Sequence, residues 1–282
     1  MLIIQATKYF NEIRLGSSLP LIVGGNDNNK YVVKLNGGGD GVIANTIEWL
    51  STKLGRLLGI PVLEPVILQI ANSFIEKVHD PEISELIDKS SGLNFGTRYE
   101  EEAVDYGENS GFNFSEKLKD DIFLYDLFLL NIDRTVRNPN IIYRNNDLWC
   151  LDFASSITMR SSVEGKDYQA RLFLPHMKKH PFYRDKVCVD DFIGRLKKVR
   201  DKNIYDIMED IPDMWLQQIA PGRDSGELRM LVGNRLIEKI NRVDILTGRM
   251  EILKELPTET EADRRSTALI NRNAFQKKYG LY

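Results

Sequence analysis

The hydrophobic pattern changes once along this chain, from short strand-like runs to helical spacing, and that change limits the fold more than any other feature. Up to about residue 75, apolar runs of strand length alternate with turn residues. Between residues 43 and 58, apolar residues instead recur every three or four positions, which is typical of an amphipathic helix. This part of the chain therefore predicts one helix among strands at residues 21–23, 31–35 and 62–70.

From about residue 115 onward, helical spacing dominates and a single hairpin interrupts it. Two apolar runs, 140–144 and 148–152, flank the polar turn 145–147, as two antiparallel strands would. The predicted helices occupy residues 116–131, 189–200, 203–209 and 225–255.

Together these patterns predict an α+β protein of two lobes. We assign residues 1–95 to a small β-rich lobe with one helix, and residues 96–256 to a larger helical lobe that contains the hairpin. Residues 257–282 turn polar, and we expect an exposed C-terminal tail there. Ligands favour clefts between two such lobes.

Composition excludes several classes of protein. Lys and Arg total 38 against 41 for Asp and Glu, a formal charge of −3, so no global basic field can gather nucleic acid or anionic lipid. Cys150 and Cys188 are too few for a disulfide framework or a four-thiolate zinc site. The longest apolar run, 122–130, is far below the roughly 20 residues that span a bilayer. We expect a cytoplasmic protein with no membrane partner and no direct nucleic-acid partner.

The densest group of polar residues, Asn131 to Asn140, follows the most hydrophobic predicted helix. Asp133 and Asn138 are five residues apart, and Asp152 leaves the hairpin 14 residues after Asn138. Because hairpin strands run antiparallel, Asn138 and Asp152 should converge. Their carboxylate and amide oxygens suit Mg²⁺, and Asp133 could accept a hydroxyl proton, which together indicate phosphoryl transfer. The alternative is that Asp133 and Asn138 only cap turns while Asp152 pairs with an arginine.

The predicted strands add a lysine that fits the same chemistry. Lys34 lies in the apolar run Val32-Val33-Lys34-Leu35, where an ammonium group needs an anionic partner. Glu48 on the following helix could supply it, in the arrangement that pairs a lysine with nucleotide phosphates and a glutamate. The alternative is an edge-strand lysine that points to solvent.

Two glycine-rich stretches compete as phosphate-binding loops. One is Gly16-Ser17-Ser18, between the first strands, and the other is Asn36-Gly-Gly-Gly-Asp-Gly41, between the lysine strand and the helix. The order of elements favours the earlier loop, which leaves the triple glycine as a mobile connector.

With these residues in view, the chain resembles the HipA-like protein kinases, in particular a compact branch without the N-terminal domain of the founding toxin. The similarity extends over roughly residues 12–250. Its motifs are Gly16-Ser17-Ser18-x-Pro20, Tyr31-Val-Val-Lys34, Glu48-x5-Leu54-x3-Leu58-Gly-Ile-Pro61, Asn131-x-Asp133-Arg134-x3-Asn138-Pro-Asn140 and Leu151-Asp152-Phe153-Ala154.

The resemblance implies a protein-kinase-like fold and ATP-dependent phosphorylation of a serine or threonine of a protein substrate. It implies that Lys34 holds the α- and β-phosphates and pairs with Glu48, that Asp133 is the catalytic aspartate, and that Asn138 and Asp152 bind Mg²⁺. Gly16, Ser17 and Ser18 would cover the nucleotide. Residues 93–98, with Asn94 and Phe95, would form the hinge that connects the lobes and contacts adenine.

This sequence departs from common kinase motifs in two places. No histidine precedes the Asp133-Arg134 pair, and Ala154 replaces the glycine of Asp-Phe-Gly. Both features are shared with lipid-kinase-like and HipA-like relatives, so they argue against an ordinary eukaryotic-type kinase rather than against catalysis.

Other features concern regulation and partners. Ser155, Ser156, Thr158, Ser161 and Ser162 form a hydroxyl-rich segment that suits an activation loop with autophosphorylation sites. No HExxH zinc motif includes His176 and His180, so we interpret them as non-metal residues and expect them at the substrate entrance.

A protein substrate is expected as partner, with a small regulatory or antitoxin-like protein as a second candidate. The alternatives are a kinase of small molecules or lipid head groups, and a nucleotide-binding regulatory protein without transfer activity.

Overall fold

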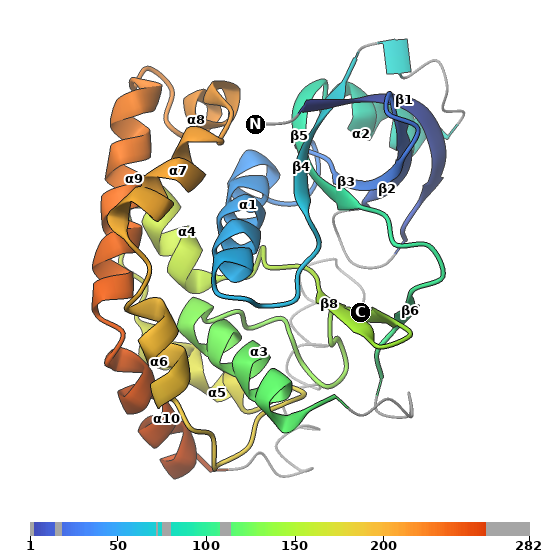
Figure 1. Ribbon diagram of the computed structural model, residues 1–282. Coiled ribbons are helices and arrows are strands. Elements are labelled where there is room, and N and C mark those ends of the chain that lie inside the picture. Colours follow the sequence, from blue (N-terminus) through green and yellow to red (C-terminus); the bar gives the residue numbers. More distant parts are fainter. Residues whose placement is uncertain (1–2, 15–18, 72, 75–79, 108–113, 258–282) are drawn as a thin grey trace, which may run out of the picture.

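Five strands at the start of the chain close on themselves into a barrel (Figure 1). In the computed structural model, the described residues are 3–14, 19–71, 73–74, 80–107 and 114–257. The strands of the barrel are β1 (Ile3–Glu12), β2 (Leu21–Gly25), β3 (Lys30–Lys34), β4 (Pro65–Ile70) and β5 (Gly92–Arg98).

The strand order is β1-β2-β3-β5-β4, and β1 closes the barrel by pairing with β2 and also with β4, the last strand in this order. Its first residues run parallel to β4, with Ile3 opposite Ile67, and its later residues run antiparallel to β2. The sequence patterns gave no bounds for β1, placed a hinge where β5 lies, and began β4 three residues too early.

Helix α1 (Gly41–Leu57) lies between the barrel and the helical lobe (Figure 1). The predicted helix is confirmed, and it ends before Gly59, whose φ of 75° is in the left-handed region. Asp40 occupies the position before the helix, but its side chain makes no capping hydrogen bond. It forms an ion pair with Arg160 instead.

The small lobe contains a second helix, so the expectation of a single helix there was wrong. Helix α2 (Pro81–Asp88) lies in the connection between β4 and β5. Its start is capped by Asp80, whose side chain accepts hydrogen bonds from the backbone of Glu82 at 2.9 Å and Ile83 at 3.4 Å.

The rest of the described chain is mostly helical. The predicted helix at 225–255 is in fact two helices, because the chain turns at residues 242–244 and Ile245 donates to the Arg242 carbonyl. The helices are α3 (Glu116–Leu129), α4 (Ile157–Glu164), α5 (Leu174–Met177), α6 (Asp190–Leu196), α7 (Asp201–Glu209), α8 (Asp213–Ile219), α9 (Ser225–Asn241) and α10 (Ile245–Glu255). A short 3₁₀ turn at Ala170–Leu172 precedes α5.

The predicted hairpin is confirmed and belongs to a three-stranded sheet. Strands β7 (Ile141–Arg144) and β8 (Asp147–Cys150) are joined by a two-residue turn, and β6 (Val104–Asp105) pairs with β7. The turn begins at Asn145 with a φ of 55°, which asparagine tolerates better than most residues.

One hydrophobic core extends across both lobes. It includes Ile67 and Phe95 of the barrel, Ile47 of α1, Leu127 of α3 and Trp215 of α8. A separate, smaller core fills the barrel. The two lobes are therefore packed on each other, and the cleft between them has a rigid floor.

Candidate active site

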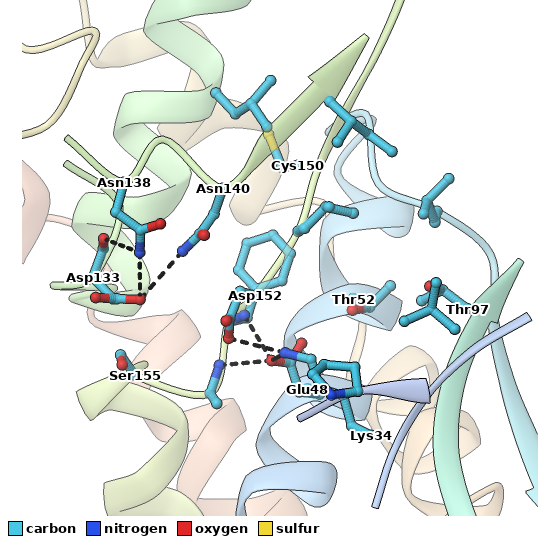
Figure 2. Close-up of a pocket in the computed structure, with 18 of the residues that line it drawn as sticks. Lys34, Glu48, Thr52, Thr97, Asp133, Asn138, Asn140, Cys150, Asp152 and Ser155 are labelled. Atoms are coloured by element: carbon cyan, nitrogen blue, oxygen red, sulfur yellow. Dashed lines mark hydrogen bonds and ion pairs between the residues drawn. The ribbon is translucent and has the colours of Figure 1, made fainter. Parts of the chain in front are cut away.

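A cleft of about 1210 Å³ lies between the barrel with α1 on one side and the hairpin with its preceding loop on the other. Figure 2 shows its polar centre, with Lys34 and Glu48 facing Asp152 and with Asp133 across from them. The cleft is larger than the pockets of roughly 300–1,000 Å³ that hold most small ligands, so it has room for a nucleotide and part of a second substrate.

Lys34 is held between two carboxylates. Its Nζ lies 2.6 Å from Glu48 Oε1 and 3.0 Å from Asp152 Oδ1. Strand alternation places Lys34 at the end of β3 facing the cleft, where only 17% of its side chain is exposed. The predicted pairing of Lys34 with a glutamate on the following helix is present in the structure, and the alternative of a solvent-facing edge lysine does not hold.

Glu48 is tied to the segment after the hairpin as well as to Lys34. The backbone N–H groups of Phe153 and Ala154 each donate to Glu48 Oε1 at 2.9 Å. This is possible because Asp152 has a φ of 56°, a left-handed conformation that turns the two following N–H groups toward α1. The strained residue thus places its own carboxylate on Lys34 while its neighbours hold Glu48.

The pKa values of the Glu48 and Asp152 carboxylates are shifted in opposite directions. Burial is the main cause that raises the pKa of Glu48 to about 7, against the lowering effect of Lys34. Burial would also raise the pKa of Asp152, but the Lys34 ammonium group and hydrogen bonds outweigh it and lower that pKa to about 2. Asp152 is therefore ionised at neutral pH, whereas Glu48 gains or loses its proton close to neutral pH.

Asp133 is the centre of a second cluster, on the loop after α3. Its Oδ2 accepts hydrogen bonds from Asn138 Nδ2 at 2.9 Å and from Asn140 Nδ2 at 3.3 Å (Figure 2). Asn140 has a φ of 50°, which turns its amide back toward the loop. The carboxylate is thereby held in one orientation on the cleft side of the loop.

The loop is supported from below by Arg134, whose side chain is fully buried. Its Nε lies 2.5 Å from Asp126 Oδ2, and its other nitrogens donate to the carbonyls of Pro139, Asn140 and Leu151. One guanidinium group therefore joins the loop to the residue that follows the hairpin as well as to those that precede it. This connection keeps Asp133 and Asp152 in the same cleft.

His180 completes this support, so its expected place at the substrate entrance was wrong. Its Nε2 lies 3.0 Å from Asp126 Oδ2, and only 2% of the residue is exposed. Burial lowers the pKa of His180, and the nearby Asp126 opposes this only in part. His176, by contrast, is exposed on α5.

The residues predicted to bind metal have the chemistry that Mg²⁺ prefers. Asp152 is ionised, its side chain is 38% exposed, and it lies in the cleft beside Lys34. Asn138 uses its Nδ2 on Asp133, which leaves the amide oxygen as its potential ligand atom. Within the described residues no group of three or more His, Cys, Asp or Glu could hold a metal. An ion held by Asp152 and Asn138 would take its other ligands from water and from substrate phosphates, as Mg²⁺ commonly does.

The predicted nucleotide-binding residues have different outcomes. Gly16, Ser17 and Ser18 lie outside the described residues. Phe95 lines the cleft opposite Lys34 in the β3–β5 register. Asn94 is fully buried on the other side of β5, where it accepts from the Asn36 backbone at 2.8 Å and donates to the Ser90 carbonyl.

Residues 92–98 form a barrel strand between β3 and β4, so the segment that connects the lobes lies after them, at residues 99–103. Tyr99, Glu100 and Ala103 of this segment line the cleft. The prediction of a hinge at 93–98 was therefore wrong by several residues.

The triple-glycine loop also lines the cleft, through Gly38 and Gly39. Gly39 and Gly41 have φ values of 54° and 59°, which favour glycine. Gly37 donates to Ser90 Oγ at 2.9 Å. The loop is thus hydrogen-bonded to the small lobe and contributes to the cleft, where the sequence prediction gave it only the role of a connector.

Sequence reasoning missed two further polar residues of the site. Arg137 lines the cleft between Asp133 and Asn138, is exposed, and forms no ion pair with any residue that the structure describes. Its position inside the Asp133-to-Asn138 motif was the only signal. Asp126 appeared as an interruption of an apolar run, and its helical position one turn before the loop could have suggested an anchor.

Comparisons with known proteins place the chain among kinases. The family model for HipA-like kinase matches residues 7–243. A proinflammatory kinase of Helicobacter pylori, CtkA, is 13% identical over 89% of this chain and 98% of its own, with a TM-score of 0.49. The Golgi casein kinase is 10% identical over 86% of this chain and 73% of its own, with a TM-score of 0.42.

A search of curated proteins found no match. Among the described helices, none combines the length and apolar character that a bilayer crossing requires.

Proposed function

Because the chain belongs to the HipA-like kinase family, we propose that it transfers the γ-phosphoryl group of ATP to a serine or threonine hydroxyl group of a protein substrate. The observation that carries this proposal is the Lys34 ammonium group held between Glu48 and Asp152, in the cleft that also contains Asp133. A cation, a metal-binding carboxylate and a potential base are the groups that phosphoryl transfer uses.

The nucleotide would lie along β3 and β5. Lys34 is the cation positioned for the phosphates of the nucleotide. Glu48 also pairs with this ammonium group, so that Lys34 does not pair with Asp152 alone. Phe95 and the connecting residues 99–103 offer an apolar face and backbone groups for the adenine. Lysine pairs with phosphates as a point charge, so its position matters more than its hydrogen-bond geometry.

Asp133 would receive the proton of the substrate hydroxyl. As the hydroxyl oxygen forms a bond to the γ-phosphorus, the bond from that phosphorus to the β-phosphate oxygen breaks and ADP leaves. Asn138 and Asn140 hold the Asp133 carboxylate by donating to one of its oxygens, and the other oxygen is left for the substrate.

Asp152 and the amide oxygen of Asn138 would hold Mg²⁺. When bound, this ion neutralises charge on the phosphate oxygens during transfer. Arg137 adds a cation from the protein itself on the same side of the cleft.

Autophosphorylation would fall on Ser155. Of the five hydroxyl residues after Asp152, Ser155 lines the cleft, whereas the others are buried and bonded to the protein backbone. The bonded residues are Ser156, Thr158, Ser161 and Ser162.

Incubation of the protein with ATP and Mg²⁺ and with a cell lysate tests this proposal, with phosphosites mapped by mass spectrometry. We expect phosphate on protein serines or threonines, and none with Lys34→Met or Asp133→Asn. A Lys202→Gln variant is the control, because Lys202 is an exposed partner of Asp206 on α7.

Label found only in small molecules or lipids would contradict the protein substrate and favour the alternative enzyme class. Absence of transfer by the wild type under all these conditions, with nucleotide bound, would favour a regulatory protein instead.

A further inference from the structure

A second cavity, of about 340 Å³, is lined by the C-terminal end of α4, whereas the cleft is lined by residues nearer the start of that helix, and this cavity has no place in the proposed reaction. It is formed where the start of α1, the end of α4 and the turn from α8 to α9 meet. Its floor is apolar and its rim is charged. The apolar residues are Ile43, Val163, Ile219, Ala220 and Leu228.

The rim carries an excess of positive charge. Lys166, Arg223 and Arg235 face a single carboxylate, that of Glu164, so the lining has two more positive than negative groups. Lys166 Nζ lies 2.8 Å from Glu164 Oε2. Within the described residues, neither Arg223 nor Arg235 forms an ion pair, and the guanidinium of Arg235 donates only to the Ser162 carbonyl, at 3.1 Å.

The position of Arg235 depends on a glycine. Gly165 follows α4 with a φ of 68°, and a Cβ there would come within 2.5 Å of Arg235 Nη2. The missing side chain lets the guanidinium group lie flat across the end of α4. Arg235 is thus held at the rim by packing, with donor groups that the protein does not fully use.

The carboxylate at the rim connects this cavity to the cleft. Glu164 Oε2 accepts from Lys166 and from Tyr168 Oη at 2.9 Å, while Oε1 accepts from Arg160 Nη1 at 3.1 Å. Arg160 in turn forms an ion pair with Asp40, and both of these residues line the cleft. An anion that attracts Lys166 weakens the ion pair between Lys166 and Glu164. Glu164 then attracts Arg160 more strongly, in competition with Asp40.

We propose that this cavity binds a small organic anion and that Glu164 couples its binding to the nucleotide cleft. A carboxylate or phosphate group would lie on Arg223, Arg235 and Lys166, and an apolar body would lie on the floor. Two guanidinium groups that form no ion pair with any described residue recognise such oxygens well, and the apolar surface favours anions that carry a hydrophobic part. Binding at this cavity does not depend on the proposed phosphoryl transfer.

Isothermal titration of the full chain with octanoate and with phenyl phosphate tests the site. We expect at least one probe to bind with a Kd below about 1 mM, and both inorganic phosphate and octanol to bind more than about tenfold more weakly. Arg223→Gln with Arg235→Gln should weaken the probe at least about tenfold, since charge-assisted hydrogen bonds are lost. Lys202→Gln, which removes one exposed cation elsewhere, should leave the Kd unchanged.

The Lys34→Met variant distinguishes binding in this cavity from binding in the nucleotide cleft. If the probe binds in this cavity, the variant should have the same probe Kd as the wild type. If neither probe binds, if the double substitution leaves the Kd unchanged, or if Lys34→Met abolishes binding, the proposed site is overturned. A far-UV spectrum and a cooperative thermal transition for each variant ensure that lost binding is not lost folding.

The coupling has its own test, in which the probe is titrated with and without saturating ADP. We expect ADP to change the probe Kd by about fivefold or more, and the probe to change the ADP Kd by the same factor. In Glu164→Gln each ligand should still bind, but ADP should no longer change the probe Kd and the probe should no longer change the ADP Kd. Equal probe affinities with and without ADP in the wild type, or full coupling in Glu164→Gln, would overturn the coupling. The ADP titration alone reports separately on the nucleotide site.

Discussion

At the scale of single residues, the informative feature is that Lys34 lies between two carboxylates of different acidity. Asp152 stays ionised down to a pH of about 2, while Glu48, more deeply buried, has its pKa raised to about 7. Near neutral pH, therefore, Glu48 is the partner whose charge varies. When Glu48 is protonated, Lys34 retains only Asp152 as an anionic partner, which also keeps Asp152 from a metal.

This predicts that phosphoryl transfer at saturating ATP increases as the pH rises through about 7, because ionised Glu48 then draws Lys34 away from Asp152. The measurement is kcat between about pH 6 and pH 8.5 at constant ionic strength, since kcat reports groups that titrate in the substrate complex. Glu48→Gln should lower kcat and remove the step. If that variant keeps the same pH profile, the step belongs to another group, such as the nucleotide itself.

Asp133→Asn should reduce kcat at least about 100-fold and leave the Kd of ADP within about twofold of the wild type, because the carboxylate accepts a proton and does not contact the nucleotide. Single-turnover assays and ADP titration measure the two quantities. Asp147→Asn, at the exposed end of the hairpin, is the matched control. A large loss of ADP affinity in Asp133→Asn would show that the residue positions the nucleotide instead.

At the scale of elements, the loop after α3 depends on buried charge. Arg134→Met should lower the free energy of unfolding by about 3–5 kcal/mol, because Asp126 is left buried without its main cation and three carbonyls lose a donor. Urea denaturation measures it. Lys202→Ala, which breaks an exposed pair on α7, should cost less than about 1 kcal/mol. Similar losses of unfolding free energy in the two variants would mean that the buried interactions of Arg134 add little to stability.

The contact between α3 and His180 predicts a pH dependence of stability. Burial lowers the pKa of His180 in the fold, whereas in the unfolded chain the imidazole takes up a proton below about pH 6.5. The unfolded state then binds more protons, so the free energy of unfolding falls as the pH drops below about 6.5.

Urea titrations between about pH 5 and pH 7.5 should show this slope, by up to about 1.4 kcal/mol per pH unit. His180→Gln should flatten the slope, and His176→Gln, at an exposed position of α5, should retain it. An unchanged slope in His180→Gln would assign it to other groups.

The sequence predicted elements well where a local pattern decides them. Helix α1 has strong helical periodicity and the hairpin has a turn signal, and the places of Glu48 on the helix and of Asp152 after the hairpin follow from them. Strand β5 could not be predicted, because Gly92, Asn94 and Gly96 disfavour a strand by propensity. Gly96 is needed by its neighbours: a Cβ there would lie 2.3 Å from Leu68 Cδ1. Such a requirement exists only after the barrel has formed, and the hinge was misplaced for that reason.

At the scale of the whole molecule, the shared core makes the two lobes one cooperative unit. Trp49 of α1 donates to the Ile207 carbonyl at 3.3 Å, and Trp215 of α8 donates to the Leu93 carbonyl at 2.6 Å, so the lobes are also hydrogen-bonded through residues that do not line the cleft.

Calorimetry should therefore show a single unfolding transition over both lobes. ADP with Mg²⁺ at about 100 times its Kd should stabilise the fold by about 2.7 kcal/mol. With Lys34→Met, the same ligand concentration should stabilise less, because the affinity is lower. Two separate transitions, of which ligand moves one, would contradict a common core.

The closure of the barrel also limits how a substrate can be recognised. β1 closes the barrel because its first residues pair with β4 and its later residues pair with β2, and β2, β3 and β5 each have a hydrogen-bonded strand on both sides. An extended peptide therefore finds no free edge on β2, β3 or β5 for main-chain hydrogen bonds, the β-augmentation that many peptide-binding domains use. On the barrel side of the cleft, selection among substrates must come from side chains, and it can change with their substitution while the strands stay the same.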